Sequence, residues 1–513
     1  MGYVEGTNRE QVVLFPAVID DYVTADNPVR FVEAFVQGLD LVGLGFSKAE
    51  PEERGRPAYD PRDLLKLYIY GYVNEIRSSR KLERETIRNV EVMWLLRRLT
   101  PDHKTIANFR KDNALLLPAV FREFSKLCRG LQLFGAELVG IDGSKLRAVN
   151  SRDRNFSAAK LNQRLQWIEE RIQAYLAALQ REDEAESEAH EVSAAELQTK
   201  IAALQEQQVV YEGLKQQLAE SGEKQLSLTD ADARLMKGRQ GQHVSYNVQI
   251  AVDSKHKLVV DYAVTNEGND VNCLAELAQG AQRELGVKEL RVCADRGYYN
   301  TAQIKTCEEA GIEVHMERPE PRQVEGIFPL QRFTYDALKD SYTCPAGKRL
   351  SYRTFDKEKQ VRCYWTEACH RCELKNQCTT GKGPRKLKRP LGQDAAERML
   401  QRVAANPQWL GLRKQLVEHP FGTIKRQMRQ DYFLLRGQEK VSGETSLTLL
   451  AYNLKRVLKL QGVEKLIEAL AKRNMKNAWP GNCFNLFTFQ RKLWPRMSSL
   501  RWRHHDINVA VAV

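Results

Sequence analysis

Hydrophobic residues recur at intervals of three and four along the first 130 positions, which is the spacing of amphipathic helices. The pattern predicts a helix and a turn over 27–45 and a strongly apolar helix over 63–76. It also predicts helices within 77–99 and another that opens at Thr105. The segment 55–61 between the first two is rich in Gly and Pro and reads as a loop. The first part of the chain is therefore expected to be all-helical.

From residue 136 the pattern predicts strands. Residues 136–150 form a β-rich run, and two more runs, 243–253 and 258–265, are joined by a short polar turn. A helix over 271–285, a buried strand over 290–294, a helix over 301–310 and a strand at 312–318 follow. Three antiparallel strands followed by two βαβ crossovers predict a mixed five-stranded sheet covered by helices, an α/β fold.

Two hydrophobic stripes at helical spacing interrupt this β region, and a charged turn lies between them. They predict an antiparallel helical hairpin whose stripes are core, and we assign it no chemistry. The first stripe contains Leu161, Leu165, Ile168, Ile172, Leu176 and Leu179, and the second contains Leu197, Ile201, Leu204, Tyr211, Leu214 and Leu218.

These patterns divide the chain into five regions. Residues 1–130 are the helical region, 151–229 the helical-hairpin insertion and 331–394 a small cysteine-rich insertion. The α/β core is expected to combine 131–150, 230–330 and 395–470. The basic tail, 471–513, contains Trp479, Trp494 and Trp502 and is expected to be either a DNA-binding or dimerising extension or a variable end.

The charge of the chain narrows the class of partner. Lys and Arg number 79 against 66 Asp and Glu, which gives a net charge of +13 and a pI near 9.1 over 513 residues. This balance favours a polyanion, nucleic acid first and an anionic membrane second. No apolar run approaches the roughly 20 residues of a membrane span, and the first residues lack the pattern of a signal peptide. We expect a cytoplasmic, nucleoid-associated protein without a membrane partner.

Basic side chains are interleaved with the predicted short helices of the first region. Short helices joined by tight turns and carrying bases are typical of a helix-turn-helix-like DNA reader. The alternative is that the charges merely solvate a helical bundle. The candidates for DNA contact are Arg77, Arg80, Lys81, Arg84, Lys104, Arg110 and Lys111.

Three carboxylates stand at positions suited to a metal site. Asp142 lies within the first predicted strand, Asp295 directly follows the fourth, and Glu418 lies in a predicted helix seven positions before Lys425. Carboxylates that leave room for water suit Mg²⁺, and a pair of such ions roughly 3.5–4 Å apart can catalyse attack on a phosphodiester. Each motif alone is more often structural. Pro420, just after Glu418, predicts a kink or a helix that begins there.

The motifs IDGSK around Asp142, ADRGYYN around Asp295 and VEHPFGTIK around Glu418 resemble the three acidic motifs of DDE transposases of bacterial insertion sequences. The text over 55–96 and 99–113 resembles the DNA-binding region of the group numbered eleven-eighty-two. The resemblance implies a ribonuclease H-like core in which Asp142, Asp295 and Glu418 bind two Mg²⁺ ions, with Mn²⁺ as a substitute. It also implies that Lys425 contacts DNA phosphate. Some relatives have an arginine four positions before the acid, where this chain has Lys414 beside Arg413, so that basic pair is a further candidate for DNA contact.

The resemblance implies a transposase that binds terminal inverted repeats, cleaves the strand at the element end and joins it to target double-stranded DNA. We expect a homodimer in the synaptic complex. The alternatives are a metal-dependent nuclease of the same core without strand transfer, and a catalytically decayed DNA-binding protein.

Five of the ten cysteines lie between residues 344 and 378, which in a reducing compartment indicates metal rather than disulfides. The CxxC spacing with cysteines on either side fits a four-thiolate structural zinc site, and free thiols are the alternative. There are five candidates for the four ligand positions: Cys344, Cys363, Cys369, Cys372 and Cys378.

Overall fold

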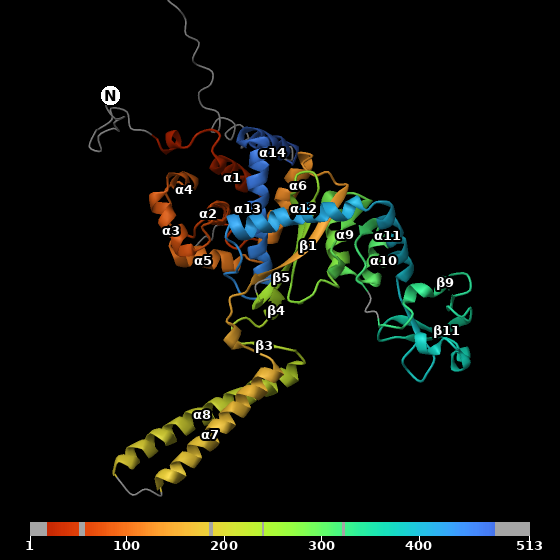
Figure 1. The fold of residues 1–513 in the computed structure, drawn as a ribbon. Helices are drawn as coiled ribbons and strands as arrows, with labels where there is room; N and C mark the ends of the chain where they lie inside the picture. Colours follow the sequence, from red (N-terminus) through yellow and green to blue (C-terminus); the bar gives the residue numbers. More distant parts are fainter. Residues whose placement is uncertain (1–17, 51–56, 184–187, 239–240, 321–323, 478–513) are drawn as a thin grey trace, which may run out of the picture.

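The structure is a computed structural model that describes residues 18–50, 57–183, 188–238, 241–320 and 324–477. It is a mixed α/β protein in which a central sheet lies between helices, with a helical hairpin and a second, smaller sheet projecting from the body (Figure 1). The first 17 residues and most of the basic tail, including Trp479, Trp494 and Trp502, lie outside the described residues.

The central sheet is built around β1 (Leu138–Arg147). β5 (Gly241–Asp253) pairs with β1 antiparallel, and β6 (Val259–Thr265) pairs with β5 antiparallel. On the other side of β1, β7 (Leu290–Cys293) and then β8 (Ile312–His315) are parallel to it. The two parallel connections run through α9 (Leu274–Leu285) and α10 (Thr301–Glu309). The predicted order of three antiparallel strands followed by two βαβ crossovers is the observed one.

The sheet has six strands rather than the predicted five. The additional strand, β4 (Arg234–Gly238), pairs with the first residues of β5, while β6 pairs with the later ones. β5 is 13 residues long, so the same edge has room for two short partners in succession. The sequence 234–238 has no alternation of polar and apolar residues, so the pattern does not predict a strand there.

The first region consists of short helices, as predicted. They are η1 (Ile19–Tyr22), α1 (Pro28–Gln37), α2 (Pro61–Val73), α3 (Ser79–Arg88), α4 (Val90–Leu95), α5 (His103–Asp112) and α6 (Leu117–Gly130). Capping side chains set several boundaries, because an Asn or Asp oxygen satisfies backbone donors of the first turn. Asn27 caps α1, and Asn89 caps α4 and so separates it from α3. Asp102 caps α5, which begins at His103, two residues before the predicted Thr105.

The helices after the small sheet close over the core. α11 (Gln393–Ala405) and α12 (Gln408–Gly422) are followed by a π-helical turn over Thr423–Gln427, then by α13 (Gln438–Gln461) and α14 (Val463–Asn477). α13 packs on α2 and α6 of the first region and on β6 of the sheet, and it is buried along most of its length. It is the helix that joins the helical region to the sheet (Figure 1).

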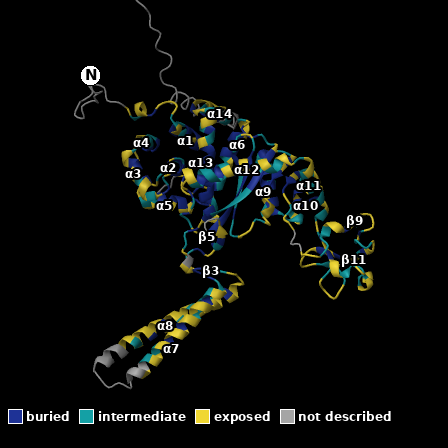
Figure 2. Ribbon diagram, viewed as in Figure 1, coloured by how far each residue is buried: buried dark blue, intermediate teal, exposed yellow. Residues whose placement is uncertain are grey.

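The hairpin is formed by α7 (Ala158–Asp183) and α8 (Glu188–Ser221). A two-stranded ladder, β2 (Asn155–Phe156) with β3 (Leu226–Ser227), closes its base. Ile168, Ile172, Ile201 and Leu204 form a narrow core between the two helices, whereas Leu176 is exposed. Most of the remaining hairpin surface is exposed, and the hairpin extends away from the body (Figure 2).

The smaller sheet is antiparallel and has the order β13-β12-β11-β10-β9. Its strands are β9 (Thr334–Asp336), β10 (Ser341–Thr343), β11 (Arg349–Asp356), β12 (Val361–Trp365) and β13 (Leu387–Pro390). Its buried core has only five side chains, Phe333, Tyr342, Leu350, Tyr364 and Leu387. Arg389 joins it to α11 by donating to both carboxylate oxygens of Glu397 at 2.8 and 2.9 Å. A core of this size is small for an independent unit.

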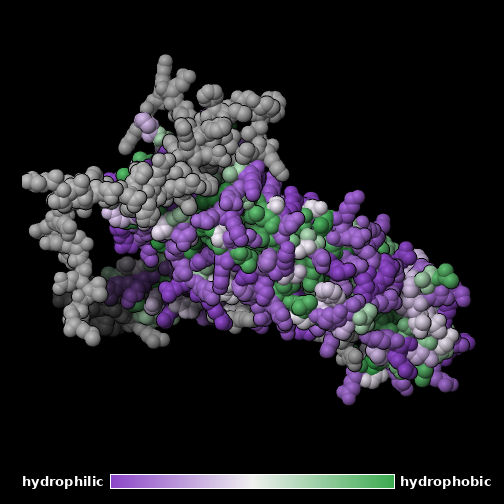
Figure 3. All heavy atoms as spheres, turned by 90° about the horizontal axis from the view of Figure 1, so that it is seen from above, coloured by the Kyte–Doolittle hydropathy of each residue, from purple (hydrophilic) through white to green (hydrophobic). Residues whose placement is uncertain are grey.

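Hydrophilic side chains predominate on the face of the molecule shown in Figure 3, with hydrophobic ones in small groups. None of the helices in the described ranges combines the length and the hydrophobicity that crossing a bilayer requires.

Arg77 is buried, although the sequence suggested a DNA contact. Its guanidinium donates to the backbone carbonyls of Tyr432 at 2.7 Å and Arg429 at 3.3 Å, and it lies 3.6 Å from the carboxylate of Glu444. It also stacks over the ring of Tyr432, with 4.4 Å between the guanidinium carbon and the ring centroid. The structure therefore uses Arg77 to join the helical region to α13 and the segment before it.

We expect Arg77→Met to destabilise the protein by about 3–5 kcal/mol, because it leaves the carboxylate of Glu444 buried without its cation. Urea unfolding followed by circular dichroism measures the change. Arg80→Met, at an exposed position in α3, is the control and should stay within about 0.5 kcal/mol of wild type. Equal stabilities for the two variants would contradict the buried ion pair.

Candidate active site

The strand register brings Asp142 and Asp295 together. β1 and β7 are paired in parallel, with Val139 opposite Val292 and Gly140 opposite Cys293. Asp142 and Asp295 each follow this last pair by two positions, Asp142 within β1 and Asp295 after the end of β7, where it caps the 3₁₀ turn Arg296–Tyr298. Neighbouring strands are about 4.8 Å apart, and the charge of Asp295 contributes to raising the pKa of Asp142, so the two carboxylates lie near each other.

Asp142 is partly buried and has two hydrogen-bond donors. The backbone N–H of Gly143 donates to its Oδ1 at 2.8 Å, and Nη1 of Arg413 donates to its Oδ2 at 3.2 Å. Burial raises the pKa of Asp142, the Arg413 guanidinium opposes this, and the carboxylates of Asp295 and Asp270 raise it further. Asp295 is exposed and accepts from the backbone N–H of Arg296 at 2.7 Å.

Helix α12 crosses the same face of the sheet and carries Glu418. Leu416 and Val417 face β1 so closely that a Cβ added to Gly140 would lie 3.2 Å from Leu416 and 3.1 Å from Val417. Glu418 follows these two residues and is exposed. The helix begins at Gln408, not at Pro420, and it continues through Pro420 before becoming π-helical at Thr423. Proline removes an intrahelical donor, which accounts for a change of helix type close to it.

The bases of α12 and the π-helical turn differ in their surroundings. Arg413 is engaged with Asp142, and Nζ of Lys425 donates to Oγ of Ser144 on β1. Lys414 is exposed. Asp142, Arg413 and Lys425 are thus gathered along the same stretch of β1, although they come from distant parts of the sequence.

Within the described residues, no three His, Cys, Asp or Glu side chains are arranged so that they could already hold a metal ion. The register accounts for the pair Asp142 and Asp295, and Glu418 lies on the helix above them without completing such a group. Carboxylate oxygens are nevertheless the ligand type that Mg²⁺ prefers.

Sequence reasoning missed Asp270, whose charge raises the pKa of Asp142. It lies in the loop between β6 and α9, and the signal that could have found it is an acid soon after a strand end, in the run NEGND. Loops at strand ends are common positions for functional side chains.

The basic candidates of the helical region fall into two groups. Arg80 and Lys104 are exposed on α3 and α5, two helices that pack against each other. Arg110 is buried like Arg77, donates to the carbonyl of Arg77 at 3.2 Å and stacks over Tyr68. The structure therefore leaves Arg80 and Lys104 accessible and uses Arg77 and Arg110 inside the protein. The other exposed bases of α3 and α5 are Lys81, Arg84 and Lys111.

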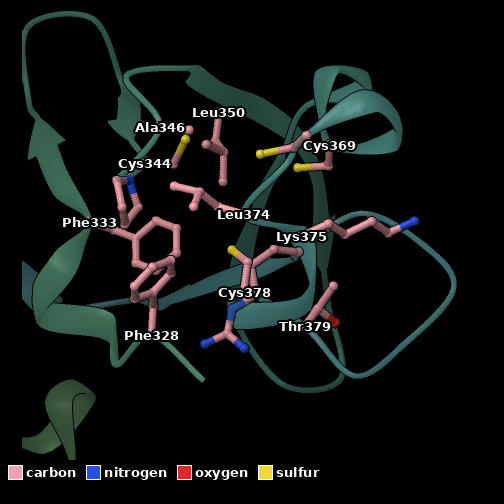
Figure 4. A pocket seen from close by; sticks show the side chains of 13 residues that line it. Phe328, Phe333, Cys344, Ala346, Leu350, Cys369, Leu374, Lys375, Cys378 and Thr379 are labelled. Atoms are coloured by element: carbon pink, nitrogen blue, oxygen red, sulfur yellow. The ribbon is translucent and has the colours of Figure 1, made fainter. Parts of the chain in front are cut away.

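Four of the five clustered cysteines line one pocket in the smaller sheet: Cys344, Cys369, Cys372 and Cys378 (Figure 4). Burial raises the pKa of the Cys378 thiol, and the other three cysteines of the pocket add to this. Cys363 is not among the lining residues, because it is buried within β12, opposite Thr354 and Lys388. All nine cysteines in the described part of the chain are free thiols.

Two family comparisons match the chain. Residues 17–112 match a transposase domain (DUF772), and residues 343–458 match a transposase DDE domain. These matches identify a DDE-type transposase of an insertion sequence. The first match covers α1 to α5, and the second covers most of the smaller sheet together with α11, α12 and most of α13, including Glu418 and Lys425. Asp142 and Asp295 lie between the two matched regions.

The remaining comparisons add little to this assignment. No curated protein matches the transposase. A solved structure described as a piggyBac transposase synaptic complex with hairpin DNA aligns with a TM-score of 0.30 and 8% identity, covering 92% of this chain and 86% of that chain. A likeness at this level carries no argument. The family matches alone support DNA as the partner and DNA cleavage and transfer as the activity.

Proposed function

We propose that this transposase binds the terminal inverted repeats of its insertion sequence and cleaves and transfers DNA strands at Asp142, Asp295 and Glu418, with Mg²⁺ as cofactor. The observation that supports the proposal is the parallel pairing of β1 with β7 up to Gly140 and Cys293, because Asp142 and Asp295, from distant motifs, each follow this pair by two residues. The six-stranded sheet, with its antiparallel β1, β5 and β6 and parallel β7 and β8, has the arrangement expected of a ribonuclease H-like core.

The residues present suit a divalent cation. Asp142 and Asp295 supply neighbouring carboxylates, and the pKa of Asp142 is raised first by burial and then by the charges of Asp295 and Asp270. When bound there, Mg²⁺ would activate the attacking oxygen and stabilise the charge of the leaving oxygen. Glu418 would add a third carboxylate from α12. Glu418 is exposed on α12 and is not part of the buried face that packs on β1, so its carboxylate is accessible.

Two cations would act beside the carboxylates. Lys425 donates to Ser144 on β1, two residues after Asp142. From there its ammonium group would bind a DNA phosphate as a point charge. Arg413 would hold Asp142 in orientation through its 3.2 Å hydrogen bond rather than contact DNA first. Lys414, which is exposed, remains a candidate for a phosphate contact.

We expect Asp142→Asn, Asp295→Asn and Glu418→Gln each to lower strand cleavage by orders of magnitude, and the losses not to add, because residues acting as one unit fail together. Lys425→Ala should have a milder effect, since it removes one phosphate contact. The assay is cleavage and joining of a terminal-repeat duplex with and without Mg²⁺.

Glu313→Gln, at an exposed position on β8 away from the three acids, is the control and should cleave normally. Normal cleavage by one of the three acid variants would remove that residue from the proposal. Cleavage without joining would favour a nuclease, and cleavage without a divalent metal would contradict the mechanism.

The exposed bases of α3 and α5 are proposed to bind the terminal repeats. Arg80→Ala combined with Lys104→Ala should weaken binding and reduce the slope of log K against log salt by about 2, since each lost phosphate contact removes about 0.9. Lys200→Ala combined with Lys215→Ala, two exposed bases on the hairpin, matches the charge change and should leave the slope unchanged. Equal slopes for both double variants would place recognition elsewhere.

We also infer that zinc stabilises the smaller sheet through Cys344, Cys369, Cys372 and Cys378. The four thiols face one pocket, and the N–H of Lys348 donates to Sγ of Cys344 at 3.3 Å, a contact that suits a thiolate. The thiols are not yet in a metal-holding arrangement, so zinc would draw them together. The small core of this sheet gives such an ion a structural role.

Cys372→Ser should abolish stoichiometric zinc and lower the thermal midpoint of the smaller sheet, because a thiolate ligand contributes directly to folding. Cys363→Ser is the matched control, since Cys363 lies in β12 outside the pocket, and it should retain zinc. Metal analysis of the purified proteins measures both. Wild-type protein without zinc, or equal zinc loss in the two variants, would contradict this site.

A further inference from the structure

Asp270, which is half-buried, is the centre of a polar network that no sequence motif predicted. Its Oδ1 accepts from Nδ2 of Asn247 at 2.7 Å and from Nε2 of Gln249 at 2.6 Å. Both donors are on β5 and are fully buried. The hydroxyl of Tyr298, also fully buried, donates to Oε1 of Gln249. Burial raises the pKa of Tyr298, so this hydroxyl keeps its proton and remains a donor.

The network contacts the segments of Asp142 and Asp295 on the face of the sheet opposite α12. Gly143, directly after Asp142, is paired with Gln249, and a Cβ there would lie 2.3 Å from Nε2 of Gln249 and 2.9 Å from Oδ1 of Asp270. The sequence needs glycine at this position because the network fills the space of a side chain. Tyr298 belongs to the 3₁₀ turn Arg296–Tyr298 that Asp295 caps.

We propose that Asp270 is a positioning residue, which through Asn247, Gln249 and Tyr298 holds the turn after Asp295 in place against β5, the neighbour of β1, and so keeps Asp295 near Asp142. Its loop is also held near this turn by a hydrogen bond from Nδ2 of Asn300 to Oδ1 of Asn272 at 3.3 Å. The role in catalysis rests on the proposed function, whereas the positioning of the turn does not.

The physical argument concerns hydrogen bonds inside the protein. A carboxylate that accepts from two buried amides fixes their orientation, and the amide of Gln249 must then present its oxygen to Tyr298. Removing the acceptor leaves the buried amide donor of Gln249 without this partner and Asn247 with only the carbonyl of Glu267, at 3.3 Å, and frees that orientation. The turn next to Asp295 then loses the hydrogen bond between Tyr298 and a fixed Gln249 amide. Groups that orient metal ligands in this way typically change activity or metal affinity by about 10–100-fold when mutated.

The experiment separates positioning from activity. Hydrogen exchange is measured by mass spectrometry on peptides covering 294–300 in wild type, Asp270→Ala and Asp270→Asn. In Asp270→Ala we expect exchange in this segment to be about tenfold faster, with little change in α13, because a local opening becomes easier. Asp270→Asn keeps an oxygen that can accept from both amides, so it should restore slow exchange. Glu267→Ala, an exposed carboxylate in the same loop, is the matched control and should behave as wild type.

Cleavage of a terminal-repeat duplex across a Mg²⁺ series is measured on the same proteins. Asp270→Ala should cleave about 10–100-fold more slowly and bind the repeats normally, and Asp270→Asn should recover most of the rate. Unchanged exchange in Asp270→Ala, or wild-type cleavage by it, would overturn the inference. Failure of wild type to cleave would contradict the proposed function alone, because the exchange measurement still decides the positioning role. Tyr298→Phe, which removes a single hydroxyl, gives the same exchange test if Asp270→Ala does not fold.

Discussion

The buried ion pair between Arg77 and Glu444 is the interaction on which the arrangement of the regions depends. Glu444 is fully buried in α13 and accepts from the backbone N–H groups of Leu434 and Leu435 at 2.9–3.1 Å. Arg77, from the helical region, lies 3.6 Å from the same carboxylate and donates to two carbonyls of the segment before α13. Three parts of the chain thus meet at one carboxylate.

The segment held by Arg77 and Glu444 also contacts the strand that carries Asp142. The segment that Arg77 and Glu444 hold follows the π-helical turn of Lys425, and it also pairs with the end of β1. The N–H of Arg147 donates to the carbonyl of Asp431 at 3.0 Å, and the N–H of Phe433 donates to the carbonyl of Arg147 at 2.8 Å. Because buried charges need well-placed partners, the positions of the helical region and of the turn with Lys425 relative to β1 are fixed together.

The sequence was informative wherever local pattern and register decide the outcome. Alternation of polar and apolar residues predicted the strands. The motif of Asp142 was expected within a strand and that of Asp295 directly after one, and the structure has Asp142 within β1 and Asp295 after β7, the parallel neighbour of β1. The sequence was uninformative about β4, which lacks a pattern, and about Arg77, because an arginine on a basic helix looks the same whether it is exposed or buried. Asp270 was missed since its importance comes from amides on another strand. Such contacts exist only after folding.

The charge balance of the site explains why the acids and Arg413 belong together. Asp142 lies near two other carboxylates, Asp295 and Asp270, and burial adds to the cost of its ionisation. Arg413 lowers its pKa, whereas the negative charges of Asp295 and Asp270 raise it. Under the proposed function, a divalent cation beside Asp142 would offset part of the negative charge of these carboxylates. Lysine at position 413 would lack the planar, fixed geometry that lets the guanidinium orient the carboxylate while an ion is bound. The arginine beside Lys414 is therefore better explained by its contact with Asp142 than by a contact with DNA.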